Sequence, residues 1–210
     1  MDGVEEMKIS FVIGNGHSRT VFDLKNLKDV GVTYGCNLLI EEFQLDNTVA
    51  CDRAMLVHLL AQGYDTVTNL WTRSRWRKMI GTGSFHELPD PVIDPKIRWD
   101  KEIHWGSGTH AIHLAASQGA DVVVMLGFDL WPRTDGLNNL YNDRTEFYDP
   151  KKVVDPSHWI HQINMVISKF KNVDFVQIQP RSWKDPDEWI KQENYSRDDY
   201  SGLASLISDR

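Results

Sequence analysis

KISFVIGNGHSR, residues 8–19, joins an apolar run to a small glycine turn. The run is rich in Ile, Val and Phe, which is typical of a buried parallel strand, and Gly14-Asn15-Gly16 predicts a tight loop where that strand ends. Glycines let a backbone pass close to a phosphate or a sugar, and a helix after such a loop offers unpaired N–H groups to an anion. The segment therefore predicts an α/β protein with a ligand site at this loop, where Asn15 and Ser18 add polar side chains.

The glycine loop departs from the dinucleotide-binding fingerprint in two ways. Arg19 stands where the third glycine of that fingerprint is expected. The next predicted strand, near residues 32–35, is followed by Cys36 and Asn37 instead of an acidic residue for a ribose. These departures disfavour NAD and FAD, and leave a nucleotide, an activated sugar or a glycine turn without a ligand.

The whole chain has 210 residues, of which 41% are hydrophobic and 25% charged, as in ordinary globular proteins of one domain. It contains no apolar run of about 18 residues and no secretory signal pattern, so we expect a cytoplasmic protein without a membrane span. Cys36 and Cys51 lack the spacing of a zinc site or a disulfide framework, which predicts reduced, buried thiols.

The formal net charge of −7 argues against a general electrostatic attraction to nucleic acid. One local basic patch, WTRSRWRK at residues 71–78, is the exception. It predicts either a solvated helix face or a contact with a phosphate or an acceptor.

Apolar strands and helical segments alternate along the chain, which predicts a parallel sheet with helices on both faces. Strands are expected at residues 8–13, 30–36, 48–52, 66–70, 121–129 and 173–179, and helices at 53–62, 109–118 and 155–171. Residues 81–103 predict irregular structure over the sheet edge, and residues 130–156 a long loop. We therefore expect one Rossmann-like domain, residues 1–180, with about six mostly parallel strands. Residues 181–210 are expected to form a polar C-terminal arm, available for contact with a second copy in a homo-oligomer.

Four stretches of the chain resemble a known family in their order and spacing. They are residues 13–18 (IGNGHS), 35–37 (GCN), 107–108 with 126–129 (SG and LGFD), and 157–161 (SHWIH). Together they resemble the bacterial sialyltransferases that use CMP-sialic acid, and a wider superfamily that includes the archaeal-type 6-hydroxymethyl-dihydropterin pyrophosphokinases. The resemblance covers roughly residues 8 to 180.

The resemblance implies transfer of a sugar from CMP or another pyrimidine nucleotide to a hydroxyl acceptor, with no cofactor required. Asn15 and Asn37 match the family's donor-binding asparagines, and Ser107 and Gly108 match further donor contacts. The family's general base falls on His161 or, in a shifted register, on His158. A histidine with a near-neutral pKa suits this role, because the acceptor hydroxyl must lose a proton as it attacks.

The sequence also departs from the sialyltransferase pattern. Trp131 follows Asp129 where the family has a tyrosine that assists the leaving phosphate, and His17 replaces a proline in the first loop. A second tyrosine of the family's long loop corresponds to Tyr141. Trp131 and Trp159 each adjoin a motif residue, and we expect both near the site.

Two other functions agree with the same residues. Asp52 and Asp129 end predicted strands and would hold Mg²⁺ in a diphosphate transfer from ATP to a hydroxymethyl group, or each would cap a turn. The third function is a nucleotide-binding protein without catalysis, which Trp131 in place of tyrosine favours. The histidine pair is equally compatible with a helix cap or a surface pair.

The expected nucleotide and donor contacts are Gly14, Asn15, Gly16, Ser18, Asn37, Asp52, Ser107, Gly108, Asp129 and Trp131. The expected catalytic residues are His161, His158 and Tyr141, with no metal ligand for sugar transfer.

Overall fold

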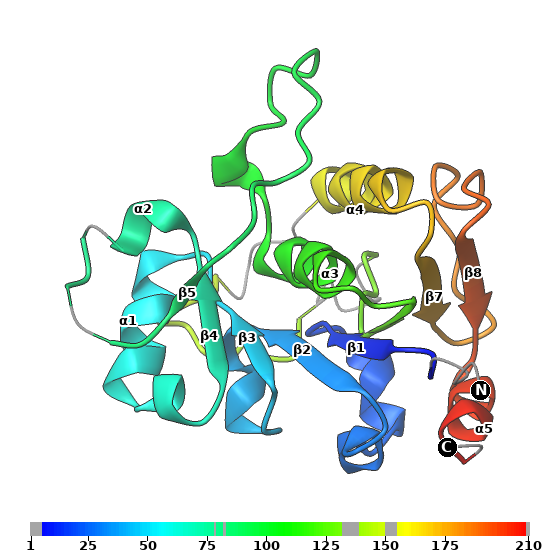
Figure 1. Cartoon of the computed structure of the whole chain (residues 1–210), viewed down its shortest axis with the longest axis horizontal. Helices are drawn as coiled ribbons and strands as arrows, with labels where there is room; N and C mark the ends of the chain where they lie inside the picture. Colours follow the sequence, from blue (N-terminus) through cyan, green and yellow to red (C-terminus); the bar gives the residue numbers. More distant parts are fainter. Residues whose placement is uncertain (1–5, 78, 82, 132–138, 150–154, 209–210) are drawn as a thin grey trace, which may run out of the picture.

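The computed structural model describes residues 6–77, 79–81, 83–131, 139–149 and 155–208, and forms one α/β sandwich (Figure 1). Its sheet has eight strands in the order β5-β4-β3-β2-β1-β6-β7-β8, and every pair of neighbours is parallel. The strands are β1 Ile9–Ile13, β2 Val32–Cys36, β3 Asn47–Val49, β4 Asn69–Thr72, β5 His86–Glu87, β6 Val122–Leu126, β7 Asp174–Ile178 and β8 Tyr195–Asp198.

Helices cover both faces of this sheet. The α-helices are α1 Arg53–Ala61, α2 Ser74–Arg77, α3 Ser107–Ser117, α4 Ser157–Lys169 and α5 Tyr200–Ser208; the 3₁₀ helices are η1 His17–Val21, η2 Leu24–Leu27, η3 Asn37–Glu41, η4 Tyr64–Thr66 and η5 Glu102–His104. In Figure 1, α3 and α4 lie above the sheet, whereas α1 and α5 lie on its other side.

Strand β1 shows why two cores form. Its side chains alternate between the faces, as strand geometry requires. Ile9, Phe11 and Ile13 pack in the core that holds α1 and α5, while Val12 packs with α3 and α4. All five residues of the strand are buried, so β1 is covered on both sides.

The expected Rossmann-like α/β class, with parallel strands and helices on both faces, is confirmed. The strand number is a correction, since the sheet has eight strands where about six were expected. The additional strands are β5 and β8, with the polar sequences His-Glu and Tyr-Ser-Arg-Asp, at the two edges of the sheet. An edge strand needs no apolar residues on both faces, so its sequence carries little signal.

Residues 181–210, expected to form a polar arm, contribute to the fold. Strand β8 pairs with β7 over four registered positions, and Leu203 of α5 is buried in the core beneath β1. Trp189 is fully buried, and its Nε1 donates a hydrogen bond to the carbonyl of Ile160 at 2.9 Å. The segment therefore completes the sheet and covers α4.

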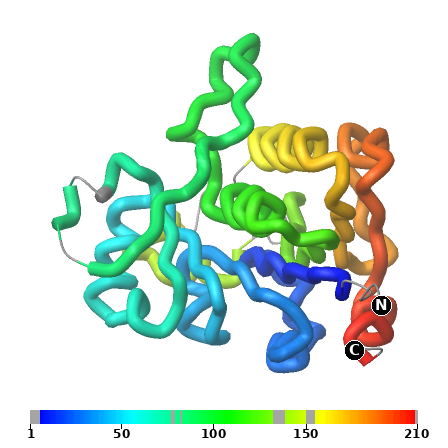
Figure 2. Tube along the Cα trace, viewed as in Figure 1, coloured from blue at the N-terminus to red at the C-terminus, as the bar shows by residue number. Residues whose placement is uncertain are grey.

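Between β5 and α3 the chain leaves the sandwich as a projection, which we call the protrusion, residues 91–104 (Figure 2). The backbone N–H of Asp94 donates to Asp100 Oδ2 at 2.7 Å and closes the turn. Buried Arg73, from the basic patch of residues 71–78, donates to the carbonyls of Ile103 and Trp105 and anchors the base of the protrusion. Irregular structure was expected at residues 81–103. The second half of this range projects away from the sandwich (Figure 1).

Candidate functional site

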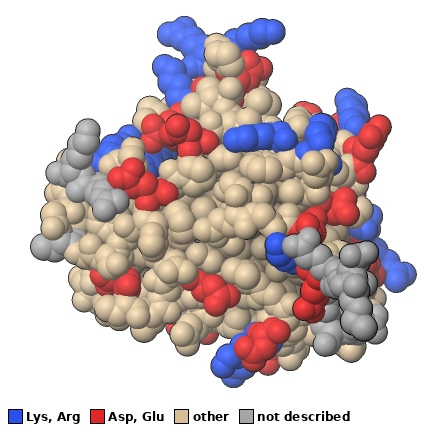
Figure 3. Space-filling view, viewed as in Figure 1, with Lys and Arg blue, Asp and Glu red and all other residues tan. Residues whose placement is uncertain are grey.

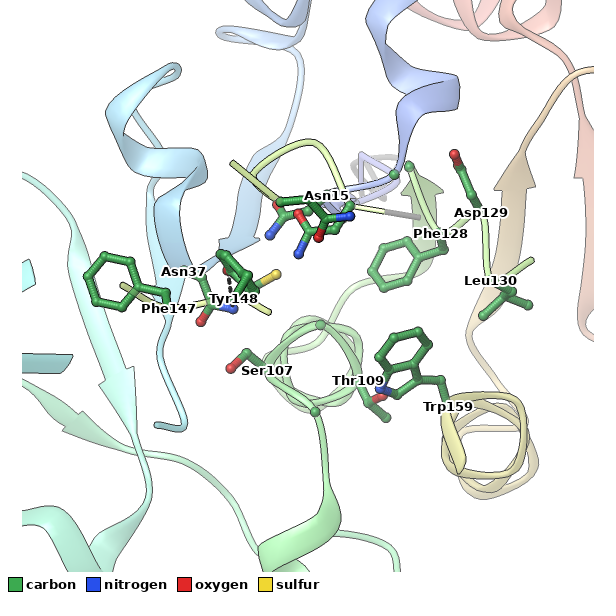
Figure 4. Close-up of a pocket in the computed structure, with 18 of the residues that line it drawn as sticks. Asn15, Asn37, Ser107, Thr109, Phe128, Asp129, Leu130, Phe147, Tyr148 and Trp159 are labelled. Atoms are coloured by element: carbon green, nitrogen blue, oxygen red, sulfur yellow. Dashed lines mark hydrogen bonds between the residues drawn. The ribbon is translucent and has the colours of Figure 1, made fainter. Parts of the chain in front are cut away.

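A cavity of about 530 Å³ opens at the carboxyl ends of the central strands (Figure 4). It lies where β1 is flanked by β2 and β6, the point at which strand order reverses. Open parallel sheets bind ligands at this position. Eight of the residues expected from the sequence line the cavity: Gly14, Asn15, Gly16, Asn37, Asp52, Ser107, Gly108 and Asp129.

Two glycine loops interlock at the floor of the cavity. Gly14 N–H donates to the carbonyl of Leu126 at 2.7 Å, and Gly16 N–H to that of Gly127 at 2.8 Å. Gly127 has a φ of +67°, in the left-handed region that favours glycine. A Cβ atom on Gly14 would lie 2.5 Å from the Gly127 oxygen, so only glycine permits this approach.

Two asparagines present buried oxygens at the cavity. Asn15 Oδ1 and Asn37 Oδ1 have no hydrogen-bond partner within the described ranges, and both residues line the cavity. Asn37 follows β2 with a φ of +56°, a conformation that asparagine tolerates better than most residues. Its Nδ2 donates to the hydroxyl of Tyr148 at 3.3 Å. Since buried polar atoms are normally paired, these oxygens are suited to a ligand with hydrogen-bond donors.

The N-terminus of α3 also faces the cavity. The N-cap residue, Gly106, has no side chain to cap this helix, although Gln162 Oε1 accepts its backbone N–H at 3.4 Å; Gly106, Ser107, Gly108 and Thr109 all line the cavity. Ser107 Oγ accepts a hydrogen bond from the backbone N–H of Cys51, which ties the helix to the end of β3. The first N–H groups of a helix lack partners inside it and attract anions.

Asp129 lines the cavity but is already bonded. Its carboxylate accepts hydrogen bonds from the backbone N–H of Ser18 at 2.9 Å, from the Ser18 hydroxyl, and from Gln179 Nε2 at 3.3 Å. Ser18 also accepts a bond from the Tyr200 hydroxyl and does not line the cavity. The Ser18–Asp129 pair therefore joins the first loop to the segment after β6.

Asp52 begins α1 at the cavity wall, with an exposed side chain that makes no capping bond. Within the described residues, no three His, Cys, Asp or Glu side chains are grouped as metal ligands. Because Asp129 is engaged by Ser18 and Gln179, this pair of carboxylates does not favour the magnesium-dependent alternative.

Two other expected residues lie outside the cavity. Tyr141 is buried and accepts a hydrogen bond from Arg19 Nη2 at 3.2 Å; burial raises its pKa. Trp131 is 41% exposed, and its Nε1 donates to the carbonyl of Lys184 at 3.2 Å. Tyr148, seven residues after Tyr141, lines the cavity instead, with its pKa also raised by burial.

The two histidines of α4 lie outside the cavity lining and contact the protrusion. His161 Nε2 is 3.0 Å from Oδ2 of the buried Asp100. The ring of His158 stacks on Trp99 with 4.2 Å between centroids and an interplanar angle of 4°. Trp159 and Ile163 of the same helix line the cavity, as expected for Trp159. The histidines therefore lie on a different side of α4 from the two residues that line the cavity.

Segment 139–149 supplies one wall of the cavity, through residues that the sequence analysis did not single out. Asn139, Asn142, Phe147, Tyr148 and Asp149 line it. The backbone N–H of Leu140 donates to the carbonyl of Asn15 at 2.8 Å, and Arg144 pairs with Glu41 at 2.7 Å. The only signal was the length of this loop, because its contacts are made with residues distant in sequence.

Comparison with models of protein families, with curated proteins and with solved structures finds no match to this chain. In the described part of the chain, no helix has both the length and the apolar sequence needed to cross a membrane.

Proposed function

We propose that this protein binds a nucleotide-activated sugar in the cavity and transfers the sugar to a hydroxyl acceptor. The observation that carries the proposal is the joint placement of the glycine loop, the oxygens of Asn15 and Asn37, and the uncapped α3 at one cavity. The asparagine oxygens would accept bonds from a base or sugar, and the α3 N-terminus would hold a phosphate. The resemblance to CMP-sialic-acid-dependent enzymes supports a pyrimidine nucleotide.

The proposed base is His161, with His158 as the alternative. A buried carboxylate bonded to a partly exposed imidazole is the arrangement that orients histidine bases in enzymes. Tyr148 lies in the cavity, where its hydroxyl would donate to the leaving phosphate.

We expect CMP, CDP or UDP to raise the melting temperature of the protein without Mg²⁺. A nucleotide at about 100 times its Kd stabilises the folded state by roughly 2.7 kcal/mol, which corresponds to about 5–10 °C for a domain of this size. The measurement is a thermal-shift screen with CMP, CDP, UDP, GDP and ATP, each with and without Mg²⁺. A shift only with ATP and Mg²⁺ supports diphosphate transfer, and no shift with any nucleotide contradicts the proposal.

His161→Ala is expected to lower kcat by about tenfold or more, because general bases contribute roughly 10²–10⁴ to rates. The assay follows nucleotide release from the sugar donor that the screen identifies. His158→Ala tests the alternative base, and His86→Ala, on the exposed edge strand β5, is the control. If neither α4 variant loses about tenfold, the proposed general base is wrong.

A further inference from the structure

The end of the protrusion carries a group of unpaired cations. Lys96, Arg98 and Lys101 are exposed, and their side chains make no hydrogen bond or ion pair with any described residue. Figure 3 shows Lys and Arg side chains at the end and along the side of this projection, with acidic side chains beside them. Such a concentration of positive charge stands out on a protein with a formal net charge of −7.

Of the three carboxylates in the protrusion, only Asp100 is buried. Asp100 is 2% exposed and is bonded to the backbone N–H of Asp94 and to Trp105 Nε1, besides His161. Asp94 accepts the backbone N–H of Lys96 at 2.9 Å, which fixes the turn. Glu102, in η5, is half-buried. The formal charges of the protrusion cancel, but its three cations are exposed whereas its three carboxylates are buried or half-buried.

A row of aromatic rings continues from these cations onto α4. Trp99 stacks on His158, and the ring of His158 is followed by that of His104, with 6.1 Å between centroids and 30° between planes. The Nδ1 atom of His104 is hydrogen-bonded to the carbonyl of Trp99, and Gln162 Nε2 donates to the carbonyl of His104 at 3.0 Å. His104 and His158 are exposed. The surface is thus held in place by α4 before any ligand binds.

We propose that this surface binds single-stranded nucleic acid. Cations beside a row of rings are the combination that contacts phosphates and stacks bases. One face of Trp99 is covered by His158, so the rings left for stacking include polar imidazoles, which suit bases better than the apolar faces of sugars. The α4 helix links this surface to the cavity, and the bound strand presents the acceptor hydroxyl. The binding of nucleic acid goes beyond the proposed function. Only the role of the bound strand as acceptor rests on the proposed function.

Fluorescence anisotropy of labelled oligothymidylate and oligouridylate, each of about 12 nucleotides, measures this binding for DNA and RNA. We expect the triple variant Lys96→Gln, Arg98→Gln, Lys101→Gln to bind about tenfold or more weakly than the unaltered protein. The slope of log K against log salt concentration should become shallower by about 2, since three cations are removed and each phosphate contact on a single strand contributes roughly 0.7. The matched control, Lys25→Gln, Lys28→Gln, Lys191→Gln, removes the same charge from exposed positions elsewhere and should bind normally.

Equal losses in the two triple variants, or no binding of either oligonucleotide, would overturn the proposal. A sulfated glycan is tested in the same assay as a competitor. If the protein binds the glycan but neither oligonucleotide, the surface is assigned to anionic sugars and the proposal is overturned. The nucleotide thermal shift is measured on the same variants. Oligonucleotide binding without any nucleotide shift would leave this inference standing and remove the proposed function.

Discussion

Gly14→Ala is expected to destabilise the protein by about 3 kcal/mol and to abolish the thermal shift with nucleotides. The added Cβ would lie 2.5 Å from the carbonyl oxygen of Gly127, a backbone atom that cannot rotate away. Relief requires the two loops to separate, which strains the bonds of Gly14 N–H to Leu126 and of Arg19 Nε to the Gly14 carbonyl. Overpacking of this kind costs about 1–3 kcal/mol, and a lost buried hydrogen bond adds about 1 kcal/mol.

Urea unfolding at pH 7 gives the free energy of unfolding of this variant, and Gly81→Ala is its control. A Cβ on Gly81 meets no atom of the described residues within 4 Å, so the same chemical change should alter stability by less than about 0.5 kcal/mol. If Gly14→Ala is as stable as Gly81→Ala, the two loops do not interlock as described. A stable variant that still binds nucleotide would also remove the glycine loop from the proposed site.

The central part of the fold was predictable because its strands are covered on both faces. Strand β1 and strand β6 are apolar runs that end in glycine turns, a pattern with few alternatives. The edge strands β5 and β8 were not predictable in the same way. Their residues are polar, and they become strands only because a neighbouring strand offers unpaired backbone groups.

The candidate site was predictable where side chains follow strands directly. Asn37 comes immediately after β2, and Asn15 is separated from β1 by one glycine. Parallel strands bring their carboxyl ends to one edge, so the topology places both residues at the cavity. Tyr148 was missed in favour of Tyr141, because both lie in one loop and sequence cannot tell which residue turns inward. Asp129 and Ser18 were expected to contact a ligand. The sequence alone cannot reveal that they bond to each other, because they lie far apart along the chain.

The protein is expected to lose stability between pH 6.5 and 4 because two histidines are buried in the neutral state. Burial lowers the pKa of His110 to about 3, with further contributions from Arg73 and His113, and lowers that of His113 to about 4, with a contribution from Lys169. In the unfolded chain both histidines titrate near pH 6.5. The unfolded state therefore binds more protons than the folded state below this pH, and stability falls with pH until the folded-state pKa is reached.

Each histidine is expected to remove about 2 kcal/mol from the free energy of unfolding at pH 5, relative to pH 7, since one pH unit below 6.5 corresponds to about 1.4 kcal/mol. Urea unfolding at pH 7, 6 and 5 measures the change. His110→Leu should flatten the profile by about half, because neither ring nitrogen of His110 has a hydrogen-bond partner in the described structure and the variant removes one titrating group. His86→Leu, at an exposed edge position, should retain the slope of the unaltered protein. A His110→Leu profile as steep as that of His86→Leu would show that protonation of His110 does not oppose folding, and that the acid sensitivity arises elsewhere.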